Sequence, residues 1–122
     1  MMWIAVALGG ALGSLARHYV NLVFAHLTET TTPYATATVN ILGSVVVGVL
    51  AGMTAGGKLH MTPVVRTFVF VGILGGFTTF SSFMLDTLTL AHGRDHGLAV
   101  SNVMFQVVVG CIAVFAGYAA AR

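Results

Sequence analysis

Charged residues are scarce in this chain. Its 122 residues include five Lys or Arg and three Asp or Glu, whereas 57% are hydrophobic. A soluble helical bundle shows a polar face to water on each helix, and so few charges cannot supply several such faces. The mean hydropathy of +0.97 is typical of a membrane protein. We therefore expect the chain to be embedded in a bilayer.

Catalytic and metal-binding patterns are missing as well. Cys111 is the single cysteine, which leaves no partner for a disulfide and no cysteine cluster for a metal. The chain has no Ser-His-Asp set and no phosphate-binding loop. His92 and His96 are four residues apart, but Gly93 and Gly97 frame them in a connection that is typical of a solvated loop. The sequence therefore predicts a protein that is not an enzyme.

Apolar runs of membrane-spanning length are, by contrast, abundant. A helix needs about 20 mainly apolar residues to cross a hydrocarbon core about 30 Å thick, and four stretches meet that need: residues 3–25, 34–56, 64–91 and 97–120. Turn and charge signals separate them. The first stretch lacks the basic residues that precede the apolar run of a secretory signal. We therefore expect residues 1–122 to form one all-α membrane domain with four transmembrane helices.

The basic residues give little information on orientation. Excess Lys and Arg normally mark cytoplasmic loops, and four spans bring both termini to one side. With the termini inside, Lys58, Arg66 and Arg122 face inward, while Arg94 faces outward and Arg17 lies toward the outer end of the first span. So weak a bias is compatible with insertion in both orientations, which permits an antiparallel homodimer, and also with a single orientation.

Polar side chains lie inside the expected spans, although hydrocarbon makes them costly and they normally face a bundle interior or a water-filled path. Outside the third span they are Arg17, His18, Asn21, Thr36, Thr38, Asn40, Asn102 and Gln106. Thr36 and Asn40 share a helix face, as do Asn102 and Gln106. These residues either join helices through hydrogen bonds or line a polar track, and their spacing leaves both roles open.

The stretch GGFTTFSSFMLD, residues 75–86, interrupts the third apolar run. Its two glycines weaken a helix through their backbone freedom. The two threonines that follow are poor helix formers whose hydroxyls compete for backbone groups. We therefore expect two half-helices, 64–74 and 80–91, with a break at 75–79. Channels and transporters use the carbonyls and helix ends freed by such breaks to hold ions.

Phe80 and Phe83 are three residues apart, so their rings project from nearly one face of the second half-helix. An aromatic ring has a negative face and a positive edge. Two edges turned toward a track would offer an anion weak, dry contacts that admit it and let it go. Core packing explains the same spacing, so the residues alone leave both roles open.

The motif GGFTTFSSF resembles the Gly-Gly-x-Thr-Thr-Phe-Ser-[Ser/Thr]-Phe signature of the Fluc (CrcB-type) fluoride channels. The likeness extends to the other three spans, through Gly10, Gly13, Arg17, Tyr19, Thr36, Asn40, Gly43, Gly110 and Gly117. Length and four-span plan are similar over essentially the whole chain.

This resemblance implies a fluoride-selective channel of the bacterial inner (plasma) membrane that exports cytoplasmic fluoride passively and so lowers its toxicity. Members of the family are antiparallel, dual-topology homodimers. The implied partners are therefore fluoride, the lipid bilayer and a second copy of the chain, with no nucleic acid. A structural sodium ion lies at the dimer centre of such channels, and by motif position the backbone carbonyls of Gly75 and Thr78 would hold it.

The resemblance also implies roles for side chains. By motif position the fluoride pathway includes Thr36, Asn40, Thr79, Phe80, Ser81, Ser82 and Phe83, with the Asn40 NH₂ as a donor to fluoride. Arg17 and Asp86 match structural or vestibule positions, and Asp86 is one methylene shorter than the family's usual glutamate. Asn102 and Gln106 stand where relatives often carry Tyr and Ser, so their membership of the pathway rests on position alone.

Two other functions stay open. A small four-span multidrug exporter has a similar length and often dual topology, but that class carries a glutamate in its first span and this chain has none there. A non-transporting scaffold subunit would use its polar residues only to join helices, and its proteoliposomes would be tight to fluoride. The lack of a carboxylate at mid-membrane favours a channel over a proton-driven exchanger.

Overall fold

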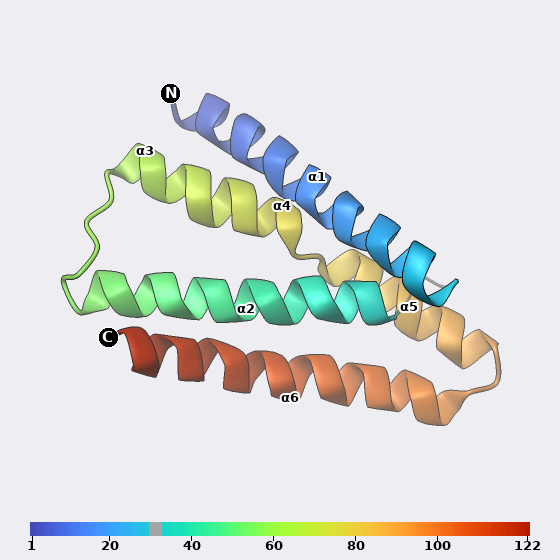
Figure 1. Cartoon of the computed structure of the whole chain (residues 1–122). Coiled ribbons are helices and arrows are strands. Elements are labelled where there is room, and N and C mark those ends of the chain that lie inside the picture. The colour runs from blue at the N-terminus through green and yellow to red at the C-terminus, as the bar shows by residue number, and fades with distance from the viewer. Residues whose placement is uncertain (30–32) are drawn as a thin grey trace.

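The computed structural model describes residues 1–29 and 33–122, and within these ranges the chain is helical with no strand. In chain order the elements are α1 (Met2–Thr28), α2 (Tyr34–Ala55), α3 (Pro63–Arg66), η1 (Thr67–Leu74), α4 (Gly75–Phe77), α5 (Phe80–His92) and α6 (His96–Ala121). The segment η1 is a π-helix. Because α3, η1 and α4 follow one another directly, they form one continuous rod, as Figure 1 shows.

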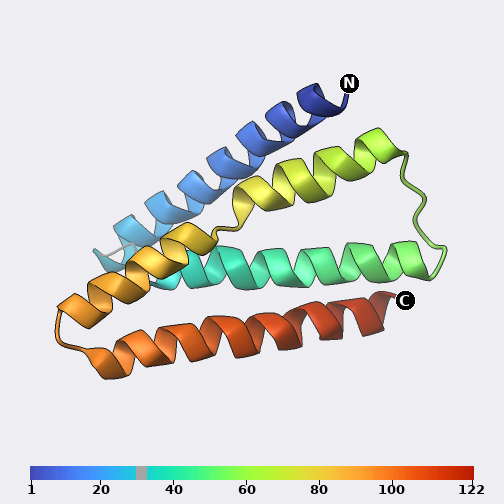
Figure 2. The same cartoon turned by 180° about the vertical axis from the view of Figure 1, so that it is seen from behind.

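Two pairs of helical elements make up the molecule. α2 packs along α6, and α1 packs against η1 and α4. Seen from the front and from behind, α2 and α6 lie side by side, and α1 runs alongside the rod (Figures 1 and 2). Both termini lie at the end of the molecule where α2 ends and α3 begins (Figure 1).

Glycines allow both pairs to approach closely. A Cβ atom on Gly52 of α2 would collide with the carbonyl oxygen of Tyr118 on α6. In the other pair, a Cβ atom on Gly76 of α4 would lie 2.7 Å from the carbonyl oxygen of Gly10 on α1. Van der Waals packing is a main source of helix association in lipid, so these backbone approaches stabilise both pairs.

Side-chain caps mark where helices begin. Thr62 accepts a hydrogen bond from the Val65 N–H (3.3 Å) at the start of α3, and Pro63 occupies the first helical position. Asp95 accepts one from the Leu98 N–H (3.0 Å) at the start of α6. Each cap satisfies an amide that has no partner within its own helix.

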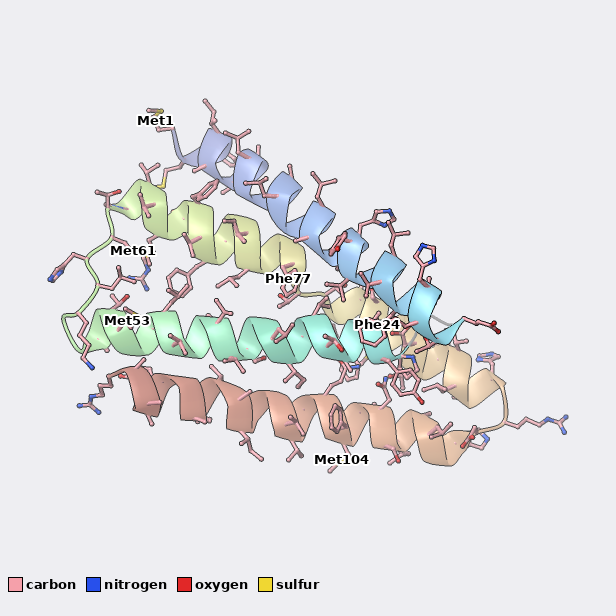
Figure 3. The ribbon with its side chains drawn as sticks, in the orientation of Figure 1. Met1, Phe24, Met53, Met61, Phe77 and Met104 are labelled. Atoms are coloured by element: carbon pink, nitrogen blue, oxygen red, sulfur yellow. The ribbon has the colours of Figure 1, made fainter. Side chains whose placement is uncertain are left out.

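The long helical stretch from α3 to α5 is interrupted at Thr78 and Thr79. Both have extended backbones, with φ/ψ of −82°/156° and −152°/117°. We expected the first half-helix to end at residue 74, but it continues to Phe77, whose side chain Figure 3 shows at the end of this rod. Gly76 lies within this helix, where its lack of a side chain permits the close approach to α1. The extended segment is therefore shorter than predicted.

Among residues 1–29 and 33–122, three helical stretches are long and apolar enough to cross a membrane: Tyr34–Ala55, Pro63–His92 and His96–Ala121. Their bounds lie close to those predicted for the second, third and fourth spans. α1 is not among the three, and it contains Arg17 and His18. The four-span, single-domain plan and the pairing with a second copy stay predictions.

Candidate functional site

A cavity of about 440 Å³ opens at the interruption between α4 and α5. Its lining comes from α2, η1, α4, α5, α6 and the two extended residues, and consists of Asn40, Gly43, Ser44, Val47, Phe70, Leu74, Gly75, Thr78, Thr79, Phe80, Phe83, Gln106 and Val107. Asn40, Phe80 and Phe83, predicted for a fluoride pathway, thus share a cavity with Gly75 and Thr78, predicted for a sodium site.

Asn40 binds both backbone groups of Thr79. The Thr79 N–H donates to Asn40 Oδ1 (2.9 Å), and Asn40 Nδ2 donates to the Thr79 carbonyl oxygen (3.1 Å). Asn40 Nδ2 also donates to Gln106 Oε1 (2.7 Å). A side-chain NH₂ has two hydrogens, so both donors of Asn40 are engaged. The side chain supplies the interrupted backbone with partners that every buried peptide group needs.

The interruption releases the carbonyl groups of residues 75–78 from the helical pattern, those of Gly75 and Thr78 among them. In a continuous helix the Thr79 N–H would donate to the Gly75 carbonyl, and the Ser82 N–H to the Thr78 carbonyl. Here the Thr79 N–H donates to Asn40, and the Ser82 N–H donates to Thr79 Oγ1 (3.2 Å). Motif position assigns two of the released carbonyls, those of Gly75 and Thr78, to sodium.

Hydroxyl groups gather at the start of α5. Thr79 caps this helix, its Oγ1 donates to Ser82 Oγ (3.1 Å), and the same atom lies 3.3 Å from Ser81 Oγ. Thr79 is buried, Ser82 is half-buried and Ser81 is exposed. The N-terminus of a helix carries a partial positive charge, so this end of α5 offers hydroxyl donors in a field that favours an anion.

Phe80 and Phe83 contact each other edge to face. Their ring centroids are 5.7 Å apart and their planes are inclined by 74°. Phe83 is 5% exposed, whereas Phe80 is 73% exposed. Both rings line the cavity, and Phe80 leaves a large apolar surface uncovered in the single chain.

A relay of amide groups continues from the cavity along α6. Gln106 Nε2 donates to Asn102 Oδ1 (2.9 Å), and Asn102 Nδ2 donates to Thr87 Oγ1 on α5 (3.0 Å). The Thr87 hydroxyl in turn donates to the Phe83 carbonyl oxygen (2.8 Å). Asn102 and Gln106 are buried, but only Gln106 belongs to the cavity lining.

Six predicted residues lie outside the cavity lining: Arg17, Thr36, Ser81, Ser82, Asp86 and Asn102. Thr36 of α2 and Asp86 of α5 are both buried and share a side-chain hydrogen bond. Asp86 Oδ2 is buried and has no hydrogen-bond partner among residues 1–29 and 33–122. Arg17 is half-buried on α1, and in the same ranges the structure records no hydrogen bond between it and the cavity.

Comparison with known proteins identifies the family of this chain. The family model of the CrcB-like protein, described as Camphor Resistance (CrcB), matches residues 4–118. The chain belongs to the CrcB family. With three stretches of membrane-spanning length, this family member is a multi-pass protein of the bacterial membrane.

Relatives of this CrcB-family chain include three bacterial proteins, each named fluoride-specific ion channel FluC. The protein of Opitutus terrae is 44% identical over 122 residues, which cover 98% of this chain and 92% of the relative. That of Paramagnetospirillum magneticum is 41% identical, with coverages of 99% and 95%. That of Paracoccus denitrificans is 44% identical, with coverages of 98% and 94%. The resemblance inferred from the motifs is therefore confirmed.

Sequence reasoning missed two polar residues of the site in this CrcB-family chain. Thr87 ends the amide relay, and Ser44 lines the cavity and donates to the Asn40 carbonyl oxygen (2.8 Å). Each stands at helical spacing from a predicted residue, Thr87 four positions after Phe83 and Ser44 four after Asn40. That spacing was the available signal.

Proposed function

We propose that this CrcB-family chain is a fluoride-selective ion channel that exports cytoplasmic fluoride passively. The observation that carries the proposal is the cavity at the helix interruption, where Asn40, Thr79, Phe80 and Phe83 meet in a chain whose relatives are named fluoride-specific ion channels. An ion pathway must replace the water that its ion loses, with contacts weak enough to release the ion. As a channel, the protein catalyses no chemical reaction.

Hydroxyls and ring edges supply these contacts in the proposal. Thr79, Ser81 and Ser82 offer hydroxyls at the positive end of α5, and the two rings of the motif offer electropositive edges. Thr36 and Asn102 continue the polar surface between α2, α5 and α6. Arg17 and Asp86 keep the structural or vestibule roles of their motif positions.

Fluoride efflux from proteoliposomes tests this function. Purified protein is reconstituted with internal potassium fluoride, and release is followed with a fluoride electrode after a potassium ionophore is added. We expect release well above that of empty liposomes and no comparable release of chloride. Tight liposomes would indicate a scaffold subunit, and equal fluoride and chloride release would exclude a fluoride-selective pathway.

We further propose that the channel is an antiparallel homodimer of dual topology. The weak charge bias and the 73% exposure of Phe80 beside the cavity support this, because a second copy would cover the exposed ring. Reporter domains that are active only in the cytoplasm or only in the periplasm are fused to the C-terminus in separate strains. Activity of both reporters is expected, and activity of one alone would contradict dual insertion.

The carbonyl groups of Gly75 and Thr78 are proposed to hold a structural sodium ion at the dimer centre. Their release from the helical pattern and their place in the cavity lining support this, because oxygen ligands suit a hard cation. A bound cation would supply positive charge and hold the interrupted backbone. Sodium should raise the thermal stability of the purified protein and support efflux, whereas a large organic cation should do neither. Equal stability and efflux in both salts would argue against the site.

A further inference from the structure

Gln106 Oε1 accepts a hydrogen bond from Asn40 Nδ2, the donor that a pathway ion would need. We infer that Gln106 Oε1 is the group that fluoride displaces from Asn40, so that Gln106 is a specificity-determining residue that sets how tightly the ion is held. The inference rests on the proposed fluoride channel and deepens it. It gives Gln106 a role that position in the motif did not supply.

The three hydrogen bonds of the Asn40 side chain differ in how easily an ion can replace them. Two join it to the backbone of Thr79, at 2.9 and 3.1 Å. Both end on backbone groups that the start of α5 holds in place, so neither partner can move aside for an ion. The third, to Gln106 Oε1 at 2.7 Å, ends on a side chain that can rotate. An ion that accepts from Asn40 is therefore expected to displace Gln106.

The position and charge of the ion make this exchange favourable. Asn40 and Gln106 both line the cavity, so an ion there lies within reach of their shared hydrogen bond. Fluoride is a charged acceptor, and charge-assisted hydrogen bonds are about twice as strong as neutral ones. It can therefore compete with a neutral amide oxygen.

The amide relay determines which end of Gln106 faces Asn40. Because the Thr87 hydroxyl donates to the Phe83 carbonyl, its oxygen is left to accept from Asn102. Asn102 then presents its oxygen to Gln106 Nε2, and Gln106 presents its own oxygen to Asn40. Asn102 is thus a positioning residue, because it holds Gln106 as an acceptor rather than a donor.

This arrangement serves permeation rather than tight binding. A pathway needs sites that are favourable enough to enter and weak enough to leave. When the ion departs, Gln106 returns to Asn40 and satisfies the donor that the ion has left. The internal competitor therefore lowers fluoride affinity and speeds release.

Two substitutions of Gln106 separate this role from a structural one. Gln106→Met keeps the length of the side chain but removes the competing oxygen, so the half-saturating fluoride concentration for efflux should fall about fivefold, which is what one neutral hydrogen bond is worth. Gln106→Glu keeps a side-chain oxygen that competes for Asn40, but this oxygen is charged and the carboxylate repels the anion. Its half-saturating concentration should rise at least about tenfold. If Gln106 were merely structural, both variants would change the half-saturating concentration in the same direction.

The control is Ser101→Ala, which alters an exposed polar residue of the same helix and should match the wild-type chain. Size-exclusion elution verifies that each variant assembles like the wild type. If the wild-type chain passes no fluoride, the proposed function fails and the inference fails with it. If the wild type conducts and Gln106→Met leaves the half-saturating concentration unchanged, only the inference is overturned.

A measurement on the unmodified protein covers the case in which these variants do not fold. Gln106 is the single glutamine of the chain, so labelling with ¹⁵N-glutamine gives one side-chain amide signal without further assignment. Fluoride should shift this signal over the concentration range that saturates efflux, and chloride should not. A signal that stays unmoved by fluoride would overturn the displacement of Gln106.

Discussion

Replacing Asn40 with aspartate tests the hydrogen bonds at the centre of the site. Asn40→Asp preserves the shape of the side chain and the acceptor for the Thr79 N–H, but it removes both donors. The Thr79 carbonyl oxygen and Gln106 Oε1 would then face a carboxylate across the 3.1 and 2.7 Å that hydrogen bonds now span. The substitution therefore changes hydrogen bonding with almost no change in volume.

The expected loss of stability follows from which of these acceptors can find another donor. Gln106 Oε1 would be a buried acceptor left unpaired, which costs about 1–3 kcal/mol. The Thr79 carbonyl keeps the hydrogen bond from the Phe83 N–H that begins α5, so its lost bond costs about 0.5–1.5 kcal/mol. Gln106 can reduce its part of this cost by rotating its amide so that the oxygen and nitrogen exchange places, provided that the Asn102 amide rotates as well. The Thr79 carbonyl belongs to the backbone and cannot turn. We therefore expect Asn40→Asp to lower the free energy of unfolding by about 2–4 kcal/mol.

Denaturant titration of the protein in detergent micelles measures this loss, and fluoride efflux measures function. Efflux should fall more than about tenfold, because a carboxylate in the cavity repels an anion. The matched control is Thr38→Val on the same helix, where only a hydrogen bond to the helix's own Tyr34 carbonyl is lost. An Asn40→Asp protein that unfolds at the same denaturant concentration as this control, and still conducts, would refute the reasoning.

Three further substitutions test the packing, the helix cap and the ring pair. Gly52→Ala should lower the free energy of unfolding by about 1–3 kcal/mol, because its methyl group collides with the α6 backbone, whereas Gly10→Ala meets no atom within 4 Å and should be neutral in the same titration. Thr79→Val removes the cap of α5 and should cost about 1 kcal/mol and reduce efflux, while Thr89→Val, which loses only an intrahelical bond, should do neither. Phe83→Ile should cut fluoride efflux without changing the size-exclusion elution of the protein, and undiminished efflux would make the ring a packing residue.

Helix positions were predictable because they depend on local composition. The second and fourth spans, expected at 34–56 and 97–120, correspond to Tyr34–Ala55 and His96–Ala121. The prediction was wrong at the glycines of the motif, because glycine both weakens a helix and permits close helix packing. The glycine pair of the motif was taken as the start of the break, but both glycines are helical, Gly76 permits the close approach to α1, and the extended torsions fall on the threonines alone.

The candidate site was predictable residue by residue, but its connections were not. Motif likeness named Asn40 and Thr79, and Gln106 was named from its position in the fourth span. It gave no reason to expect that one asparagine would bind both backbone groups of Thr79, or that both of its donors would be engaged. Thr87 went unnoticed because its spacing from Phe83 indicates a shared helix face but not the residue of α6 that it contacts.

By itself the sequence determined the membrane character, the helix lengths and the family, because hydropathy, helix propensity and a long motif are properties of neighbouring residues. Only the tertiary structure decided what the polar groups bind. Asn40 meets Thr79 and Gln106 across 39 and 66 positions of the chain, and such contacts depend on how α2, α5 and α6 dock. The docking follows from backbone approaches at glycines and from the two extended threonines, which turn buried amides and carbonyls toward side chains that lie far away in the sequence.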